Sequence, residues 1–164
     1  MPRDPISDTE LRETLDWVAI RRLHARYADV VNRRAWPELA DLFLPDAVVR
    51  VEMPRQEPVE AVGPAALGAF IDAAVKRFDW FQFVVLEARI EWPAGGPDDE
   101  ALGRLYMVEL RLDAKTGQET KAFGLYQDRY RRTAAGWRFA ARRFQPTTWS
   151  GRDLSTLPLP ALDF

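Results

Sequence analysis

Residues 64–92, PAALGAFIDAAVKRFDWFQFVVLEARIEW, contain the point at which the apolar pattern of the chain changes its period. In the first part of this stretch apolar residues recur at spacings of three and four, which predicts a helix from Pro64 to about Phe78. The buried side of that helix would be formed by Leu67, Phe70, Ile71 and Val75. In the second part the period becomes two, which predicts a strand over 81–92. The change of period therefore separates a helical half of the chain from a half rich in strands.

Upstream of this stretch the pattern is mainly helical. A long helix is predicted over about 7–32 and a short one over 36–43. One face of the long helix carries Ile20, Leu23, His24, Tyr27 and Val31. Residues 47–53, rich in valine, are predicted as a short strand. Residues 54–63 contain two prolines and no period, which indicates a loop, with a lid as one interpretation.

Downstream, three further strands are predicted over 101–113, 119–132 and 137–145, with turn residues between them. Helices followed by hairpins are typical of an α+β fold in which helices cover one face of a sheet. We therefore expect a single domain over 1–164, with its core at about 10–148 and a tail over 149–164. Strands of this length must bend. A cone-shaped barrel follows, with about three helices packed on a strongly curved, mostly antiparallel sheet and a cavity inside the cone.

Composition narrows the classes of function. The chain of 164 residues contains no cysteine, which excludes disulfides, thiolate nucleophiles and cysteine-ligated metals. A formal charge of −2 argues against nucleic-acid binding, which favours a basic excess. No apolar run is long enough to span a membrane, and the first residues lack the pattern of a signal peptide. The expectation is a cytoplasmic globular protein without nucleic-acid or membrane partners.

Two groups of segments stand out along the chain. The first is Ala19–Leu23, Arg26–Asp29, Asn32, Trp36, Leu39–Phe43 and Asp46–Val49, and the second is Tyr126–Tyr130 and Gly136–Arg143. Together they resemble SnoaL-like proteins of the nuclear-transport-factor-2-like superfamily, over about residues 10–148. The resemblance implies the cone-shaped fold. It leaves the activity open, because the superfamily includes ketosteroid isomerases, dehydratases, polyketide cyclases, dehydrochlorinases, dioxygenase β subunits and non-enzymes.

The resemblance also implies where acid and base groups would lie. Tyr27 matches the tyrosine that donates to the oxyanion in ketosteroid isomerases. Their general-base aspartate matches Val51, which cannot accept a proton. The aspartate of dehydratase-like members matches Asn32, and the histidine paired with it matches Gln82 or Phe83. Both acid/base pairs of the family are therefore absent from this sequence.

The remaining candidates for chemistry each have a structural alternative. His24, the only histidine, lies one turn before Tyr27 and is either a general base or a half-buried residue hydrogen-bonded near the sheet. Tyr27 is either an oxyanion donor or a core residue, and Asn32 is a candidate polar group of the pocket. Tyr126 and Asp128 alternate onto one strand face, which lines the cavity or faces another subunit. We favour the cavity for one of them.

Other charged residues are interpreted structurally. Glu109 and Arg111 share a strand face and are expected to form a cross-strand charge set rather than a catalytic pair. The arginines near the last hairpin are expected to pair with acidic neighbours such as Asp128. One histidine without a clear carboxylate cluster predicts no metal site, and no cofactor motif is present.

The function predicted from these features is that of a cofactor-independent lyase, isomerase or cyclase. Its substrate would be a small, largely apolar carbonyl or hydroxyl compound held in the cone cavity. His24 and Tyr27 would be catalytic, and the substrate-binding residues would be Asn32, Val51, Gln82, Phe83, Tyr126 and Asp128. The alternative is a non-catalytic ligand-binding or subunit-interaction module of the dioxygenase β-subunit type. Strands that are apolar on both faces predict a homodimer through the outer face of the sheet.

Overall fold

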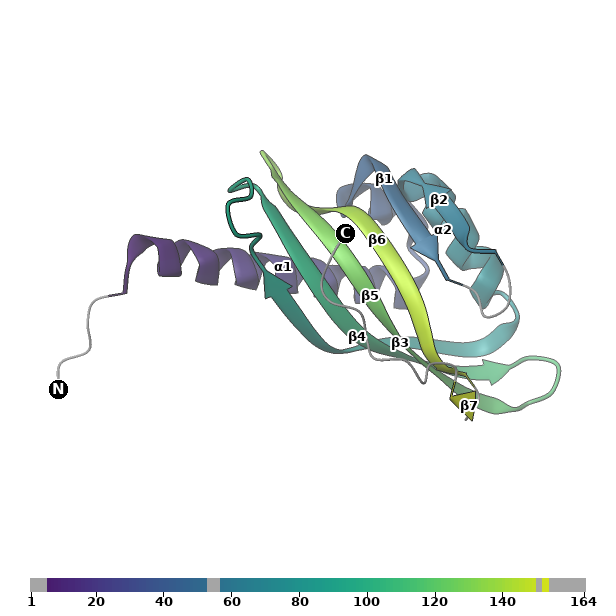
Figure 1. Ribbon diagram of the computed structural model, residues 1–164. Coiled ribbons are helices and arrows are strands. Elements are labelled where there is room, and N and C mark those ends of the chain that lie inside the picture. The colour runs from purple at the N-terminus through teal and green to yellow at the C-terminus, as the bar shows by residue number, and fades with distance from the viewer. Residues whose placement is uncertain (1–5, 53–56, 150–151, 154–164) are drawn as a thin grey trace.

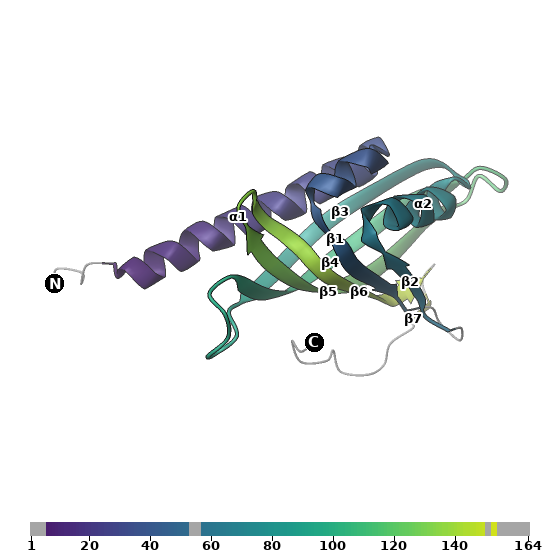
Figure 2. The same ribbon diagram turned by 90° about the horizontal axis from the view of Figure 1, so that it is seen from above.

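The computed structural model describes residues 6–52, 57–149 and 152–153, and the predicted tail lies almost entirely outside them. The elements are α1 (Asp8–Arg33), the 3-10 helix η1 (Trp36–Asp41), β1 (Phe43–Val51), β2 (Val59–Val62), α2 (Gly63–Val75), β3 (Phe78–Glu91), β4 (Glu100–Asp113), β5 (Glu119–Thr133), β6 (Gly136–Trp149) and β7 (Arg152–Asp153). The helices pack on one curved sheet, seen from two directions in Figures 1 and 2. The predicted α+β cone is confirmed, with a sheet that curves without closing.

The sheet is mixed, and its strand order is β2-β1-β6-β5-β4-β3, with β7 on β6. Only β1 and β6 pair in parallel among the described strands, and every other pairing is antiparallel. Strands β3 to β6 have 14 or 15 residues and bend at register shifts, one of them between Val85 and Glu87 and another between Arg129 and Tyr130. Such bulges increase the local twist, which lets long strands wrap around one side of α1.

Several predicted boundaries are wrong: β1 begins at Phe43 rather than at residue 47, and two further errors concern the predicted loop and the second helix. The segment predicted as a loop contains β2, whose residues 59–62 pair with β1. Two prolines near this segment argue against a strand, so the sequence predicts none here. The strand can nevertheless form, because Pro58 lies just before it and an edge strand needs a partner on one side only. The second error is the end of α2, which lies at Val75, because Phe78 already pairs with Asp113 of β4. Residues 53–56, part of the supposed lid, lie outside the described residues.

Helix α1 begins with a capping box and ends in a left-handed cap. The Ser7 hydroxyl accepts the Glu10 N–H at 3.2 Å, and the Glu10 carboxylate accepts the Ser7 N–H at 2.9 Å. Its buried residues start only at Asp16, so the first turns project beyond the sheet, as Figures 1 and 2 show. Among the described helices none is long and apolar enough to cross a membrane.

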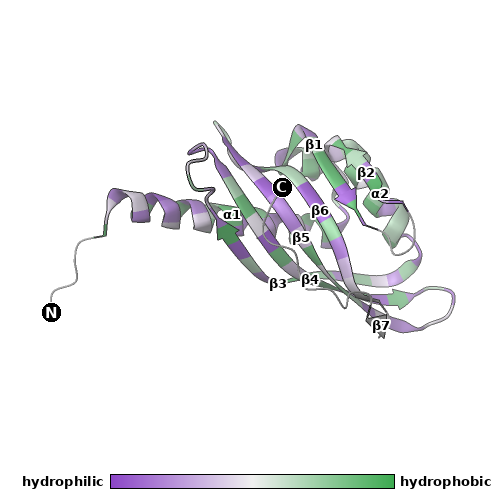
Figure 3. Ribbon diagram, in the orientation of Figure 1, coloured by the Kyte–Doolittle hydropathy of each residue, from purple (hydrophilic) through white to green (hydrophobic). Residues whose placement is uncertain are grey.

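Polar contacts tie both ends of the packed part of α1 to the sheet. At one end, the indole N–H of Trp137 donates to Asp16 at 2.9 Å. At the other, the Asn32 amide accepts the Phe83 N–H at 2.7 Å and donates to the Phe83 carbonyl at 2.9 Å. Between them the apolar side of the sheet meets the helix, and the strands alternate polar and apolar residues along their length (Figure 3). The helix therefore has a fixed register over the concave face.

Close packing on the concave face requires a glycine at position 103. A Cβ atom there would lie 2.5 Å from the hydroxyl oxygen of Tyr130, which is completely buried. We expect Gly103→Ala to lower the free energy of unfolding by about 1–3 kcal/mol, because the buried ring must shift. Urea denaturation measures this loss. In a Tyr130→Phe background the loss caused by Gly103→Ala should be smaller, because the hydroxyl that the new Cβ meets is gone. If the losses from the two substitutions were fully additive, this explanation would be wrong.

Candidate functional site

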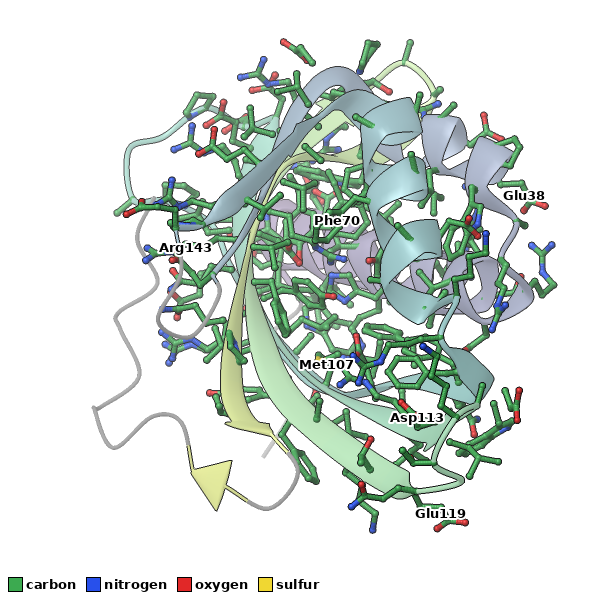
Figure 4. The ribbon with its side chains drawn as sticks, turned by 90° about the vertical axis from the view of Figure 1, so that its right-hand side faces the viewer. Glu38, Phe70, Met107, Asp113, Glu119 and Arg143 are labelled. Carbon is green, nitrogen blue, oxygen red and sulfur yellow. The ribbon has the colours of Figure 1, made fainter. Side chains whose placement is uncertain are left out.

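A cavity of about 380 Å³ lies between α2 and the concave face of the sheet. Figure 4 views the molecule from this side and labels Phe70 of α2, which is part of the wall. Most of the lining is apolar and includes Val31, Val49, Val51, Leu67, Ile71, Phe81, Phe83 and Phe144. The polar lining comes from Tyr27, Arg77, Glu109, Arg111 and Tyr126. Such a cavity fits a small apolar ligand that carries one or two polar groups.

Tyr27 of α1 and Tyr126 of β5 form one polar part of the wall, and a buried arginine stands behind them. The guanidinium carbon of Arg142 lies 4.3 Å from the ring centre of Tyr27 and 4.1 Å from that of Tyr126. It also lies 4.1 Å from the ring centre of Phe139. A cation against the faces of aromatic rings is stabilised by their negative quadrupole, most of all away from water. The two tyrosines are thus held against a permanent positive charge.

Arg142 is held by Asp128 in the core. Its Nε donates to Oδ1 at 2.6 Å and its Nη2 to Oδ2 at 2.8 Å, and neither side chain is exposed. The Tyr130 hydroxyl donates to the same Oδ2 at 2.9 Å and lies 2.7 Å from Nε2 of His24. Since the Tyr130 proton points to Asp128, His24 must donate from Nε2. A chain of four polar side chains therefore links α1 to β6 through the core.

Burial sets the protonation states in this chain and beside it. Burial, followed by the charges of Arg142 and Arg21, lowers the pKa of His24 to about 3, so the ring is neutral near pH 7. Burial also raises the pKa of the Tyr27 hydroxyl, although Arg142 and hydrogen bonding with Tyr126 pull it down. Tyr126 has a pKa well above its ordinary value, again through burial first. Both cavity tyrosines therefore keep their protons and can donate hydrogen bonds.

A second polar part of the wall comes from the concave face of β4. Arg111 donates to Glu109 two residues away on the same strand face, and both side chains are largely buried. The guanidinium carbons of Arg111 and Arg77 lie 5.3 Å and 4.8 Å from the ring centre of Phe78. Arg77 in turn pairs with Asp113 at 3.7 Å. The cavity that contains the tyrosines thus also contains an acidic group held by a basic one.

Four of the predicted site residues line the cavity: Tyr27, Val51, Phe83 and Tyr126. Gln82 does not, because it alternates with Phe81 and Phe83 and so faces the other side of β3. Asn32 lies outside the lining as well, since its amide is occupied by the Phe83 backbone. The roles assigned to these residues stay predictions.

The predicted common pocket of His24, Tyr27 and Asn32 is not what the structure shows. His24 is 2% exposed and contacts Tyr130 rather than Tyr27. Asp128 is likewise in the core, where it forms an ion pair with Arg142. One turn of α1 separates His24 from Tyr27. His24 therefore lies in the core beside Tyr130, and Tyr27 lies at the cavity.

Three residues in or near the cavity are not predicted from the sequence as site residues: Glu109, Arg111 and Arg142. The expected charge pairing is confirmed, since Glu109 pairs with Arg111 and Arg142 with Asp128. Alternation with Met107 places Glu109 and Arg111 on one strand face. Nothing in the sequence shows that this face is the concave one. Over the described ranges, no three His, Cys, Asp or Glu side chains are grouped so that they could hold a metal ion.

An open curved sheet whose concave face and helices enclose an apolar cavity defines the nuclear-transport-factor-2-like class of α+β proteins. Within that class, the model of the SnoaL-like domain matches residues 12–143, and the chain belongs to this family. The family predicted from the sequence is therefore confirmed. No curated protein matches the sequence.

Solved structures agree with this assignment. A hexachlorocyclohexane dehydrochlorinase, LinA-type3 from Novosphingobium barchaimii, is 20% identical, with a TM-score of 0.72 over 92% of this chain and 98% of that one. A protein assigned as a scytalone dehydratase from Novosphingobium aromaticivorans is 21% identical, with a TM-score of 0.72 over 92% and 94%. A nuclear-transport-factor-2-like protein from the same species is 25% identical, with a TM-score of 0.67 over 86% and 90%. These likenesses show the fold.

The low pKa of His24 has a consequence for stability. The unfolded chain binds a proton at this residue below about pH 6.5, whereas the folded chain does so only near pH 3. Stability contributed by the neutral ring is therefore present at pH 7 and lost as the pH falls. Compared with His24→Gln, the wild type should lose about 2 kcal/mol more free energy of unfolding between pH 7 and pH 5. Urea unfolding at both pH values measures this, and a difference that does not change with pH would contradict it.

Proposed function

We propose that this protein is a cofactor-independent enzyme of the lyase, isomerase or cyclase type, acting on a small, largely apolar carbonyl or hydroxyl compound in the cavity. The observation that carries the proposal is the pair of protonated tyrosines, Tyr27 and Tyr126, at the wall of an apolar cavity with Arg142 against their rings. Dehydrochlorinase and dehydratase names among the structural neighbours are consistent with this kind of chemistry.

The chemical role proposed for the tyrosines is to stabilise negative charge on a substrate oxygen. A hydroxyl group that donates in an apolar site stabilises an oxyanion more than it does in water, because little water competes with it. Arg142 adds a fixed positive charge that needs no reorganisation during the reaction. Burial keeps the tyrosines protonated at neutral pH, so the donors are in place before the charge develops. In this proposal His24 supports Asp128 and Arg142 through Tyr130, and does not itself transfer the proton.

A binding module remains the second candidate function, on one specific observation. By the resemblance, Val51 matches the general-base aspartate of ketosteroid isomerases and Asn32 matches the aspartate of dehydratase-like members. The Asn32 amide is fully engaged with the backbone of β3. A chain without turnover would use the same cavity to hold an apolar ligand. The two candidates differ in one measurable property, which is conversion of a bound compound.

A Tyr27→Phe substitution tests the enzyme. We suggest nitrobenzisoxazole as the probe, a flat apolar compound that opens to a phenolate when a base removes its ring proton. We expect wild-type turnover, and a kcat about 10²-fold lower in Tyr27→Phe, because one oxyanion donor is lost. The release of the coloured phenolate measures the rate.

Tyr106→Phe is the matched control, because Tyr106 lies on β4 but alternates with the cavity residues and faces the other side of the sheet. Its kcat should equal that of the wild type. Binding of para-nitrophenol without any turnover of nitrobenzisoxazole would favour the binding module instead.

We also propose that the protein is a homodimer through the outer face of the sheet. Trp80 of β3 and Phe123 of β5 lie on that face and are 47% and 40% exposed, and the described helices contact the sheet from the other side. Light scattering at micromolar concentration should give twice the mass of 18.8 kDa. Phe123→Glu should shift it to the monomer, and a monomeric wild type would refute the proposal.

A further inference from the structure

We propose that Glu109 is the base that removes a proton from the ligand, that Arg111 is its positioning residue, and that the ligands are flat carbon acids whose oxygen becomes negative beside Tyr27 and Tyr126. This inference rests on the proposed function and names the proton acceptor that such a reaction needs. Both acid/base pairs of the family are replaced in this chain, and His24 lies away from the cavity. A proton acceptor must therefore come from another element.

Glu109 has the right place for this role. Within the described part of the chain, it is the only acidic side chain in the lining of the cavity. It lies on the concave face of β4, and its neighbours across the sheet, Phe83 of β3 and Ala122 of β5, are both apolar. A carboxylate placed among apolar side chains costs stability, and the pairing with Arg111 offsets that cost, so Glu109 can stand as an acidic group in the cavity wall. The side chain is 17% exposed, which leaves it open to a ligand.

The pairing with Arg111 engages one carboxylate oxygen. Arg111 donates through Nη2 to Oε2 of Glu109, and this bond does not involve Oε1. Since the two residues stand two apart on one strand face, the ion pair fixes the direction of the carboxylate without covering both oxygens. Arg111 itself is held against the Phe78 ring. This arrangement positions one oxygen as an acceptor while the other anchors the side chain.

The base and the oxyanion donors act on the same space. Burial is the main cause of the raised pKa of Tyr27 and of Tyr126; the charge of Glu109 raises both a little further, and Arg142 opposes the rise. Glu109 is therefore within electrostatic range of both hydroxyl groups. Glu109 and the two tyrosines line the same cavity as Phe83 and Phe144. In this proposal a flat ligand turns its acidic C–H bond to Glu109 and its oxygen to the tyrosines. This geometry separates the two charges that a proton abstraction produces.

The probe reaction balances with these groups alone. The Glu109 carboxylate takes the ring C–H proton of nitrobenzisoxazole and becomes a carboxylic acid. The electron pair of that bond forms the third bond of a nitrile, and the N–O bond breaks. The oxygen stays on the aromatic ring as a phenolate, beside the hydroxyl groups of Tyr27 and Tyr126. Solvent then takes the proton from Glu109, and no oxidant, reductant or metal is needed.

The test compares Glu109→Gln with Glu100→Gln. Glu100 lies on the same strand and pairs with Arg131 at 2.7 Å, outside the cavity lining, so it is a matched control for the loss of one paired carboxylate. We expect kcat for nitrobenzisoxazole to fall at least 10²-fold in Glu109→Gln and to stay unchanged in Glu100→Gln. Binding of para-nitrophenol should persist in Glu109→Gln, which shows that the cavity has remained intact.

Arg111 is tested as a positioning residue. Arg111→Gln should lower kcat while KM for the probe stays close to the wild-type value, because the base is present but poorly directed. Arg111→Lys should recover part of the lost kcat, since an ammonium group can hold one carboxylate oxygen. If Arg111 had only a structural role, its substitution would lower stability, but kcat would not fall while KM stayed at the wild-type value.

The outcomes separate this inference from the proposed function. If wild-type turnover falls in Tyr27→Phe but not in Glu109→Gln, the base lies elsewhere and the inference is wrong, while the proposed function stands. If the wild type does not convert the probe at all, both are wrong. Loss of turnover in both variants, with Glu100→Gln unchanged, supports both.

Discussion

The fold is organised around the buried ion pair of Arg142 and Asp128. A guanidinium without contact to water is costly unless its charge and its donors are satisfied, and Asp128 satisfies two of them at 2.6 and 2.8 Å. Aromatic faces surround the rest of the cation. Because those rings come from α1, β5 and β6, the pair fixes how the long helix lies on the sheet. The position of Tyr27, and with it one wall of the cavity, follows from this requirement.

The same constraint gives the cavity its electrical asymmetry. The Arg142 guanidinium, paired with Asp128, lies behind the tyrosines, and the Glu109 carboxylate, paired with Arg111, lines the same cavity from β4. The rest of the wall is mostly apolar, so the fields of these two ion pairs are weakly screened. A neutral ligand that must separate charge in order to react is favoured by such a field, whereas a strongly charged ligand would have to shed its water. The proposed reaction and the proposed substrate class are both matched to such a field.

The sequence predicts the fold well because periodicity and turn residues are local. The helix over 7–32 and the long strands beyond residue 81 differ from the structure by only a few residues at most ends. The strand at residues 59–62 was missed because pairing with β1 is not visible in a local pattern. The site was harder to predict. Whether Glu109 faces the cavity depends on which side of the sheet is concave, and the burial of His24 depends on how α1 is rotated over the strands. Both are properties of tertiary packing.

The ion pair also limits which substitutions the chain can accept at positions 128 and 142. Removing only one partner leaves a buried charge without compensation, at a cost of about 3–5 kcal/mol, which is a large share of the stability of an ordinary domain. Positions 128 and 142 are therefore expected to change together across relatives, or not at all. An apolar replacement of both would preserve folding but abolish the field behind the tyrosines. Relatives that have kept the architecture without the proposed chemistry should be recognisable by that concerted exchange.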